Sequence, residues 1–370
     1  MIDFIFKESY RMSLNEVLMS IMGIGVIIGA IDRILGNKWG LGAKFEEGFM
    51  CLGPTALSMV GIICLSPFLA EVLKPLIVPV FHLLGADPAM FASILAIDMG
   101  GYPLAMALAE NVQVGQFSGL IVSTMLGATI VFTIPVGLGL IPKEDHTYFA
   151  KGLLIGLVPI PIGSIIGGIL MGIPFKVVLI NSIPILLIAL CLMIGLIFKQ
   201  EQMVKGFNYF GQGIKIITTV GLGLAAFTYL TKIETIPNMP SIMSCMETVA
   251  GICIVLLGSL PLMTLILNVL KRPFEKLGEL LGLNAASIGG ILFSCISVLP
   301  VFKLFGEMNE RGKVVTTAFF VSGIAVFAAH LGYAADVAPN MLLPMITAKL
   351  SSGFIAILLA LLMTKSEDSV

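Results

Sequence analysis

The sequence predicts an all-α polytopic membrane protein that contains inverted repeats and two broken or re-entrant helical segments. Three observations support this fold class. The first is composition, because 58% of the 370 residues are apolar and only 12% are charged, whereas ordinary soluble domains carry about 25% charged residues. The second is a series of apolar runs long enough to cross a bilayer. The third is an internal repeat.

The apolar runs predict nine full membrane spans, since each approaches the roughly 20 residues that a spanning helix requires. They lie near 14–35, 48–73, 117–141, 151–172, 177–198, 213–231, 243–270, 314–333 and 341–364. Two further runs, 88–109 and 285–306, are apolar but interrupted by small residues and proline. Each interrupted run either crosses the membrane once or enters it and returns.

A period of 197 residues relates the two interrupted runs. Without a gap, 72–103 and 269–300 share ten identical residues, which indicates internal homology. We therefore expect a single membrane transport domain over 1–370. Its predicted parts are repeat one at 14–141, connecting spans at 142–212, repeat two at 213–335, and a last span and tail at 336–370.

The distribution of basic residues predicts the orientation of the spans. If both interrupted runs are re-entrant and the amino terminus is outside, 15 of the 21 Lys and Arg residues face the cytoplasm, 5 face outward and Lys349 lies within a span. If both runs cross, the best orientation places 11 inside and 9 outside. Because cytoplasmic loops carry an excess of Lys and Arg, re-entrance is favoured. Re-entrance also inverts repeat two relative to repeat one, as in many secondary transporters.

Composition and motifs exclude several classes of protein. The net charge of −1 argues against nucleic acid as a partner, since nucleic-acid binding requires a basic surface. The six cysteines show no CxxC spacing and no neighbouring histidines, so neither a metal site nor a disulfide framework is expected. The sequence has no phosphate-binding loop, nucleophile elbow or zinc-protease motif. We therefore expect the lipid bilayer as a partner, no enzymatic activity and no cofactor.

The first interrupted run contains the strongest candidate for a functional residue, Asp98. A carboxylate inside a bilayer costs at least a few kcal/mol, and Gly100, Gly101 and Pro103 weaken the helix that follows it. Transporters bind substrates at such helix breaks, where backbone groups are exposed. We expect Asp98 to bind a cationic substrate or to carry a proton, with a turn-capping carboxylate as the alternative.

The residues beside Asp98 complete this predicted site. Gly100 and Gly101 let a substrate approach backbone carbonyl groups, and Tyr102 offers an aromatic face and a hydroxyl group. A purely structural role for the two glycines is the alternative.

Five other residues are candidates for substrate binding. Glu46 and Glu47 lie just before the second run, where they either form an acidic vestibule that attracts cations or cap a helix in water. Ser297, at the second interruption, can supply a hydroxyl group. His330 is either a proton relay or substrate partner, or a packing residue near the interface. Thr133 lies in a helix weakened by a proline, for which a packing kink is the alternative to a binding role.

Five motifs carry a resemblance to a known family. They are FEEGFM at 45–50, DMGG at 98–101, TIVFTIPVGLG at 129–139, RGKV at 311–314 and HLGYAA at 330–335. With these motifs in the same order, and over residues 15–364, the chain resembles the ethanolamine utilisation permease family, EutH. The resemblance implies a multi-pass protein of the bacterial cytoplasmic membrane that imports ethanolamine as a source of carbon and nitrogen.

The predicted site suits the substrate that the resemblance implies. Protonated ethanolamine presents one ammonium and one hydroxyl group, which a buried carboxylate, an aromatic face and backbone carbonyls can bind. We expect an ethanolamine permease that works by secondary transport or facilitated diffusion, assembled as a homo-oligomer with a dimer as the preferred state. The alternatives are a channel for the neutral amine and a membrane receptor or scaffold that senses ethanolamine.

Overall fold

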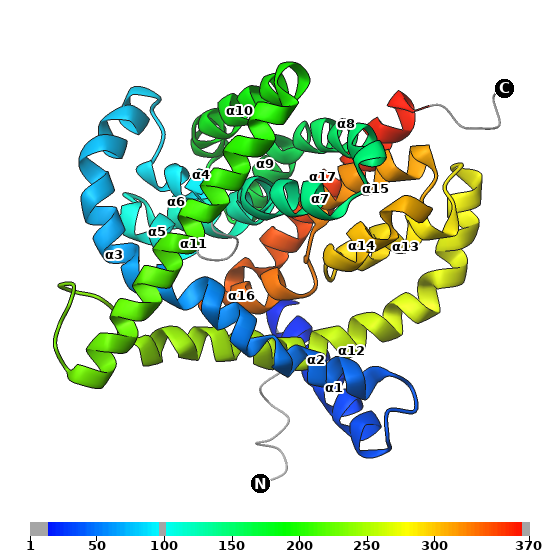
Figure 1. The fold of residues 1–370 in the computed structure, drawn as a ribbon, viewed down its shortest axis with the longest axis horizontal. Coiled ribbons are helices and arrows are strands. Elements are labelled where there is room, and N and C mark those ends of the chain that lie inside the picture. Colours follow the sequence, from blue (N-terminus) through cyan, green and yellow to red (C-terminus); the bar gives the residue numbers. More distant parts are fainter. Residues whose placement is uncertain (1–13, 96–100, 365–370) are drawn as a thin grey trace, which may run out of the picture.

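The computed structural model describes residues 14–95 and 101–364, and within these residues it contains helices and no strand (Figure 1). Eight helical segments in this part of the chain are long and apolar enough to cross a membrane. They are Asn15–Ile34, Leu41–Leu83, Val112–Leu140, Lys143–Leu170, Phe175–Phe198, Lys205–Thr231, Ile242–Leu270 and Pro339–Met363. The predicted class of an all-α polytopic membrane protein is confirmed.

The first half of the described chain contains the elements α1 (Leu14–Ile34), α2 (Leu41–Met50), α3 (Leu52–Leu83), η1 (Pro88–Phe91), α4 (Ala92–Leu95), α5 (Gly101–Leu108), α6 (Val112–Gln116), η3 (Phe117–Gly127), η4 (Thr129–Thr133), α7 (Ile134–Leu140), η5 (Lys143–Asp145), α8 (His146–Leu157) and α9 (Ile160–Leu170). The second half contains α10 (Phe175–Phe198), α11 (Gln200–Thr231), α12 (Ile242–Leu280), α13 (Ala285–Ser294), α14 (Leu299–Leu304), η6 (Phe305–Glu307), α15 (Glu310–Gly323), α16 (Ala329–Val337), η7 (Pro339–Met341) and α17 (Leu342–Met363). Elements η3 and η4 are π-helical, and the other η elements are short 3₁₀ helices.

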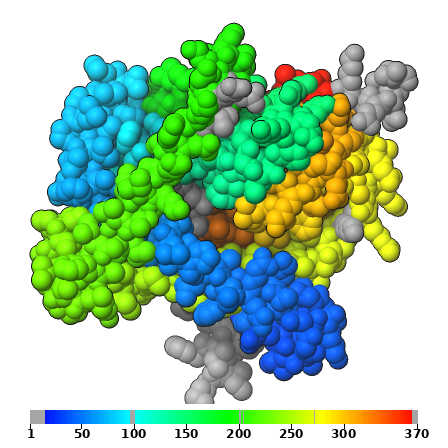
Figure 2. Space-filling view, viewed as in Figure 1, coloured from blue at the N-terminus to red at the C-terminus, as the bar shows by residue number. Residues whose placement is uncertain are grey.

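The centre of the molecule is built from α8, α9, α15 and α17, which pack on one another and on η3. The long helix α12 runs along the lower edge of Figure 1 and contacts α1, α2, α3 and α16. Figure 2 shows α11 as a diagonal ridge across this face and α1 with α2 as a lobe at the lower right. The outer helices therefore surround this central group.

Small residues allow the outer helices to approach closely, as is common in membrane proteins. A Cβ atom added to Gly61 on α3 would lie 1.8 Å from the carbonyl oxygen of Thr218 on α11. A Cβ atom added to Gly221 on α11 would lie 2.2 Å from Gly61 O. Only glycine permits this contact between α3 and α11.

The second interrupted segment returns to the place where it begins. We call residues 285–308 hairpin two. At its base, the Asn284 side chain donates from Nδ2 to Glu307 O at 2.8 Å, and Asn309 Nδ2 donates to Gly282 O at 2.9 Å. Asn284 and Asn309 also cap the helices that follow them, α13 and α15. These bonds hold the two ends of hairpin two together.

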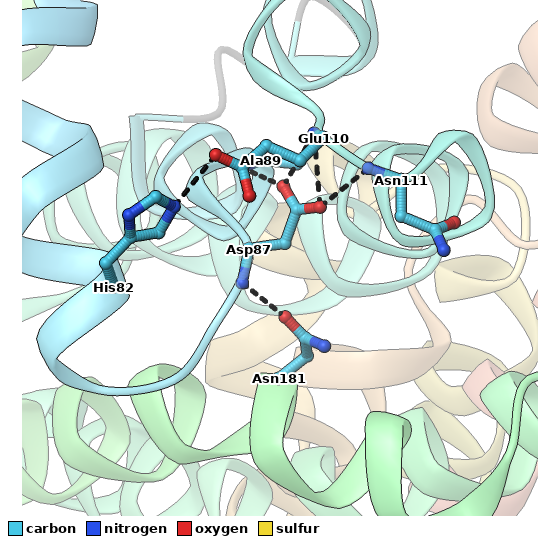
Figure 3. A network of polar contacts seen from close by, with 6 residues as sticks. All are labelled: His82, Asp87, Ala89, Glu110, Asn111 and Asn181. Carbon is cyan, nitrogen blue, oxygen red and sulfur yellow. Dashed lines mark hydrogen bonds and ion pairs between the residues drawn. The ribbon is translucent and has the colours of Figure 1, made fainter.

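The first interrupted segment has the same kind of closure, and we call residues 88–110 hairpin one. The Asp87 carboxylate accepts hydrogen bonds from the backbone N–H groups of Ala89, Glu110 and Asn111, at 2.8 to 3.3 Å (Figure 3). Asp87 N in turn donates to Asn181 Oδ1 at 2.8 Å. The two ends of hairpin one are therefore adjacent, and this segment does not carry the chain across the molecule.

The two hairpin bases match at the 197-residue period. Gly85 and Gly282 both have positive φ, 68° and 66°. Phe81 O accepts from Ala86 N at 3.0 Å, and the equivalent Gly278 O accepts from Leu283 N at 2.8 Å. In Figure 1 the preceding helices end far apart, α3 at the upper left and α12 at the far right. The inverted arrangement of the repeats and their limits stay predictions.

The prediction of an uninterrupted span at 314–333 was wrong. The chain leaves α15 after Gly323 and enters α16 at Ala329, so residues 324–328 form a third break. Hydropathy did not reveal this break because unwound backbone within an apolar run has the same composition as a helix. Such backbone is stable in a membrane protein only where other protein groups bond it.

Candidate functional site

The third break lies against the tip of hairpin two. Ala325 N donates to Ser294 O at 2.8 Å, and Phe327 N donates to Cys295 O at 3.0 Å. Ala325 has a positive φ of 52°, a backbone conformation that few non-glycine residues adopt. We call this meeting of residues 294–298 with residues 324–328 the junction. Two interrupted helices about 30 residues apart in sequence thus satisfy each other's backbone groups.

His330 and Tyr333 extend from the junction on α16, and both are buried. His330 Nδ1 lies 3.0 Å from Ile324 O. Because a carbonyl oxygen only accepts, Nδ1 is the protonated nitrogen of this contact. The contact fixes the imidazole at the start of the break, which is compatible both with a packing residue and with a proton relay or substrate partner. The predicted candidate His330 is therefore a junction residue, and its role in binding stays a prediction.

Tyr102 of the first interrupted segment contacts Tyr333 edge to face, with ring centroids 6.0 Å apart and ring planes at 87°. Its neighbour Gly101 is buried at the start of α5. The candidates Asp98 and Gly100 lie outside the described residues. The structure thus joins the first interrupted segment to α16 through two aromatic rings.

Two residues at the centre were not among the predicted site residues. Tyr333 has no exposed surface, and its hydroxyl has no hydrogen-bond partner among the described residues. Lys349 on α17 is equally buried, and its Nζ donates to Thr124 O at 2.6 Å. The signal for Lys349 was present in the sequence, because it is a charged residue within an apolar run. The state of the Tyr333 hydroxyl had no sequence signal.

Thr133 is buried on η4, and its hydroxyl also has no hydrogen-bond partner in the described part of the chain. The neighbouring Thr129 bonds across to α15, donating from Oγ1 to Val321 O at 3.1 Å. Thr133 therefore lies on a helix that contacts α15, and a substrate contact for it stays a prediction.

A cavity of about 490 Å³ brings together two other candidates, Glu47 and Ser297. It lies between α2, α12, α13 and α14, and we call it the hairpin-two cavity. Its polar lining residues are Lys44, Glu47, Thr264, Asn268, Glu275 and Ser297. Apolar side chains such as Phe293 and Leu292 form most of the remaining wall. A small molecule with a cationic end and a polar end can bind in such a cavity.

The two adjacent glutamates of α2 have different surroundings. Glu47 lines the hairpin-two cavity and forms an ion pair with Lys44 at 2.6 Å. Glu46 is not a lining residue and forms an ion pair with Arg33 at 2.6 Å. All four side chains are at least 41% exposed, so water screens these pairs and each contributes little to stability. Of the two, Glu47 is better placed to attract a cation.

Comparison with known proteins supplies the family. The sequence model described as "Ethanolamine utilisation protein, EutH" matches residues 14–363. The chain belongs to the EutH family. This confirms the predicted resemblance.

Several relatives of this EutH family member match over nearly their whole length. A Listeria monocytogenes protein named probable ethanolamine permease EutH is 47% identical over 353 residues, covering 95% of each chain. The Bacillus subtilis protein YxeR is 40% identical over 359 residues, and a Salmonella typhimurium protein named probable ethanolamine permease EutH is 38% identical over 397 residues, each covering 97% of both chains. No solved structure matches the chain.

Proposed function

We propose that this protein is a permease that imports protonated ethanolamine across the bacterial cytoplasmic membrane, by secondary transport or facilitated diffusion. The observation that carries the proposal is the junction, where hairpin two and a broken helix meet inside a multi-pass EutH family member. Transporters place substrate and ion sites at such breaks because opened backbone supplies hydrogen bonds near the middle of the membrane. The permease names of the relatives agree with this function.

The side chains around the junction suit both ends of ethanolamine. We assign Asp98 to the ammonium on the basis of its charge and its sequence position. The Tyr102 and Tyr333 rings offer aromatic faces that attract a cation. The Tyr333 hydroxyl, which has no partner among the described residues, can bond the substrate hydroxyl. We assign His330 to the same hydroxyl end of the substrate.

The hairpin-two cavity is proposed as a vestibule on the route to the junction. Its lining carries two carboxylates, Glu47 and Glu275, and one ammonium group, Lys44, so the net charge favours cations. Ser297 lines the cavity, whereas Cys295, two residues earlier, bonds the break at residues 324–328. A movement of hairpin two would therefore connect the cavity with the junction.

Transport by purified protein in proteoliposomes tests this function. We expect saturable uptake of labelled ethanolamine, together with counterflow, when pH, sodium and voltage gradients are imposed one at a time. Binding without uptake would instead identify a receptor. Uptake that does not saturate, shows no counterflow and follows the neutral amine would identify a channel.

A further inference from the structure

Lys349 is a charged residue of the apolar helix α17, and its side chain is buried. It has no exposed surface, and its Nζ donates to Thr124 O on η3 at 2.6 Å. Transfer of an ammonium group from water into a protein interior is unfavourable even when the group is hydrogen-bonded. Ionisable residues in this setting usually belong to a substrate or ion pathway. The position of Lys349 is therefore best explained by function.

The surroundings of Lys349 place it beside the junction. Cys295 at the tip of hairpin two and Leu350, which follows Lys349 on α17, belong to the same hydrophobic cluster. Cys295 O is the group that bonds Phe327 N of the third break. Helix α17 also packs against η3, α15 and α16. Lys349 therefore lies where hairpin two, the broken helix and the π-helix η3 come together.

Lys349 ends in the same chemical group as the proposed substrate. Lysine and protonated ethanolamine both present a primary ammonium with three N–H donors and one positive charge. Acceptors that bind one of these groups can therefore bind the other. The lysine ammonium is carried on a flexible four-carbon stem, so it can leave such acceptors and return to them without leaving the protein.

We propose that Lys349 is a tethered substitute for the substrate's ammonium. In the substrate-free protein it occupies ammonium acceptors beside the junction, among them Thr124 O, and during transport it yields them to ethanolamine. This inference rests on the proposed function, because it takes the substrate to be a protonated primary amine. An empty transporter that kept these acceptors unpaired would change conformation slowly, since buried unpaired acceptors are unfavourable. Lys349 pairs these acceptors in the empty protein and so lowers the barrier. The empty protein can then return to its outward-facing conformation without binding another cation.

Two transport assays on Lys349→Met test the proposal. The substitution removes the charge and keeps an unbranched apolar side chain of similar length. Net uptake into vesicles without internal substrate requires the empty protein to return, whereas exchange of external labelled for internal unlabelled ethanolamine does not. We expect net uptake to fall by about tenfold or more, and exchange to stay within about twofold of wild type, because only the empty step has a higher barrier.

Lys151→Met is the matched control. Lys151 Nζ also donates to a backbone oxygen, Met363 O at 3.2 Å, but this residue is exposed on α8. Its substitution is expected to leave both assays unchanged. Lys349→Arg retains a positive charge and is expected to keep more net uptake than Lys349→Met.

Other outcomes overturn the proposal. Lys349→Met with both activities unchanged, or with both reduced equally, shows that Lys349 has no specific role in the return of the empty protein. If Lys349→Met is not recovered as folded protein by size-exclusion chromatography, the ratio of net uptake to exchange in Lys349→Gln gives the same decision. Wild-type protein that shows neither uptake nor exchange contradicts the proposed function itself, which is a separate result.

Discussion

At the scale of single residues, the buried hydroxyl of Tyr333 is available to bond the proposed substrate. Its side chain has no exposed surface, and its hydroxyl has no hydrogen-bond partner among the described residues. An unsatisfied buried polar group costs about 1–3 kcal/mol. If the substrate hydroxyl bonds Tyr333, as proposed, it removes this cost. The free energy released contributes to substrate binding.

Tyr333→Phe should therefore affect binding and stability in different ways. The substitution removes only the hydroxyl, so the thermal stability of the substrate-free protein should stay the same or rise. Ethanolamine affinity should fall by about tenfold, the loss expected for one hydrogen bond of ~1.4 kcal/mol. Thermal unfolding and equilibrium binding of the purified variant provide the two measurements. A lower melting temperature with unchanged affinity would give the hydroxyl a structural role.

Asp98→Asn is expected to have a larger effect on affinity. The amide keeps the size of the side chain but removes the charge that would pair with the substrate's ammonium. Loss of a buried charge partner costs about 3–5 kcal/mol, which corresponds to a decrease in affinity of at least hundreds-fold. Asp98→Glu should be less harmful. Protein yield and melting should change little, and a folded variant with unchanged affinity would shift attention to Glu47 and His330.

At the scale of elements, the two hairpin bases use different hydrogen-bond chemistry at equivalent positions. Asp87 accepts at both carboxylate oxygens, from the backbone N–H groups of hairpin one. Asn284 accepts from Ser287 N through Oδ1 and donates from Nδ2 to Glu307 O. An amide at position 87 would direct its NH₂ group toward a backbone N–H, and a carboxylate at 284 would direct an oxygen toward a carbonyl. Each residue therefore suits only its own hairpin.

Asp87→Asn and Asn284→Asp should each destabilise the protein by about 1 kcal/mol, the value of one hydrogen bond at a partly exposed site. Thermal unfolding in detergent measures the effect. Asn340→Asp, at an exposed position on η7, is the matched control and should leave the melting temperature unchanged. Equal melting temperatures for all three variants would mean that these bonds do not hold the hairpins closed.

At the scale of the whole molecule, cysteine labelling from either side of the membrane tests the predicted orientation. Cysteines at Lys74 and Gln113 should both react from outside, and cysteines at Lys276 and Glu310 should both react from the cytoplasm. All four native side chains lie on the surface of the protein. Opposite labelling within either pair would show that the chain between the two positions crosses the membrane.

The sequence predicted those features that leave a signal in the sequence itself, and it missed those that depend on tertiary contacts. Apolar runs depend on local composition and revealed eight of the spans, and identities between distant segments revealed the paired interrupted segments. The break at 324–328 depends on carbonyls of Ser294 and Cys295, about 30 residues earlier, and contains no proline as a local signal. The hairpin-two cavity likewise joins Glu47 to Ser297 only through tertiary packing. Of the central residues, Lys349 had a local signal because of its charge.

The bonds between hairpin two and the third break link movement to hydration. If hairpin two withdraws, Ala325 N and Phe327 N lose their carbonyl partners. Each unpaired buried N–H group costs about 1–3 kcal/mol, so withdrawal becomes favourable only when water or substrate replaces the lost carbonyls. The interior therefore becomes wet in the same step in which it opens. While the hairpin is in place, both N–H groups are bonded to protein carbonyls and require no water.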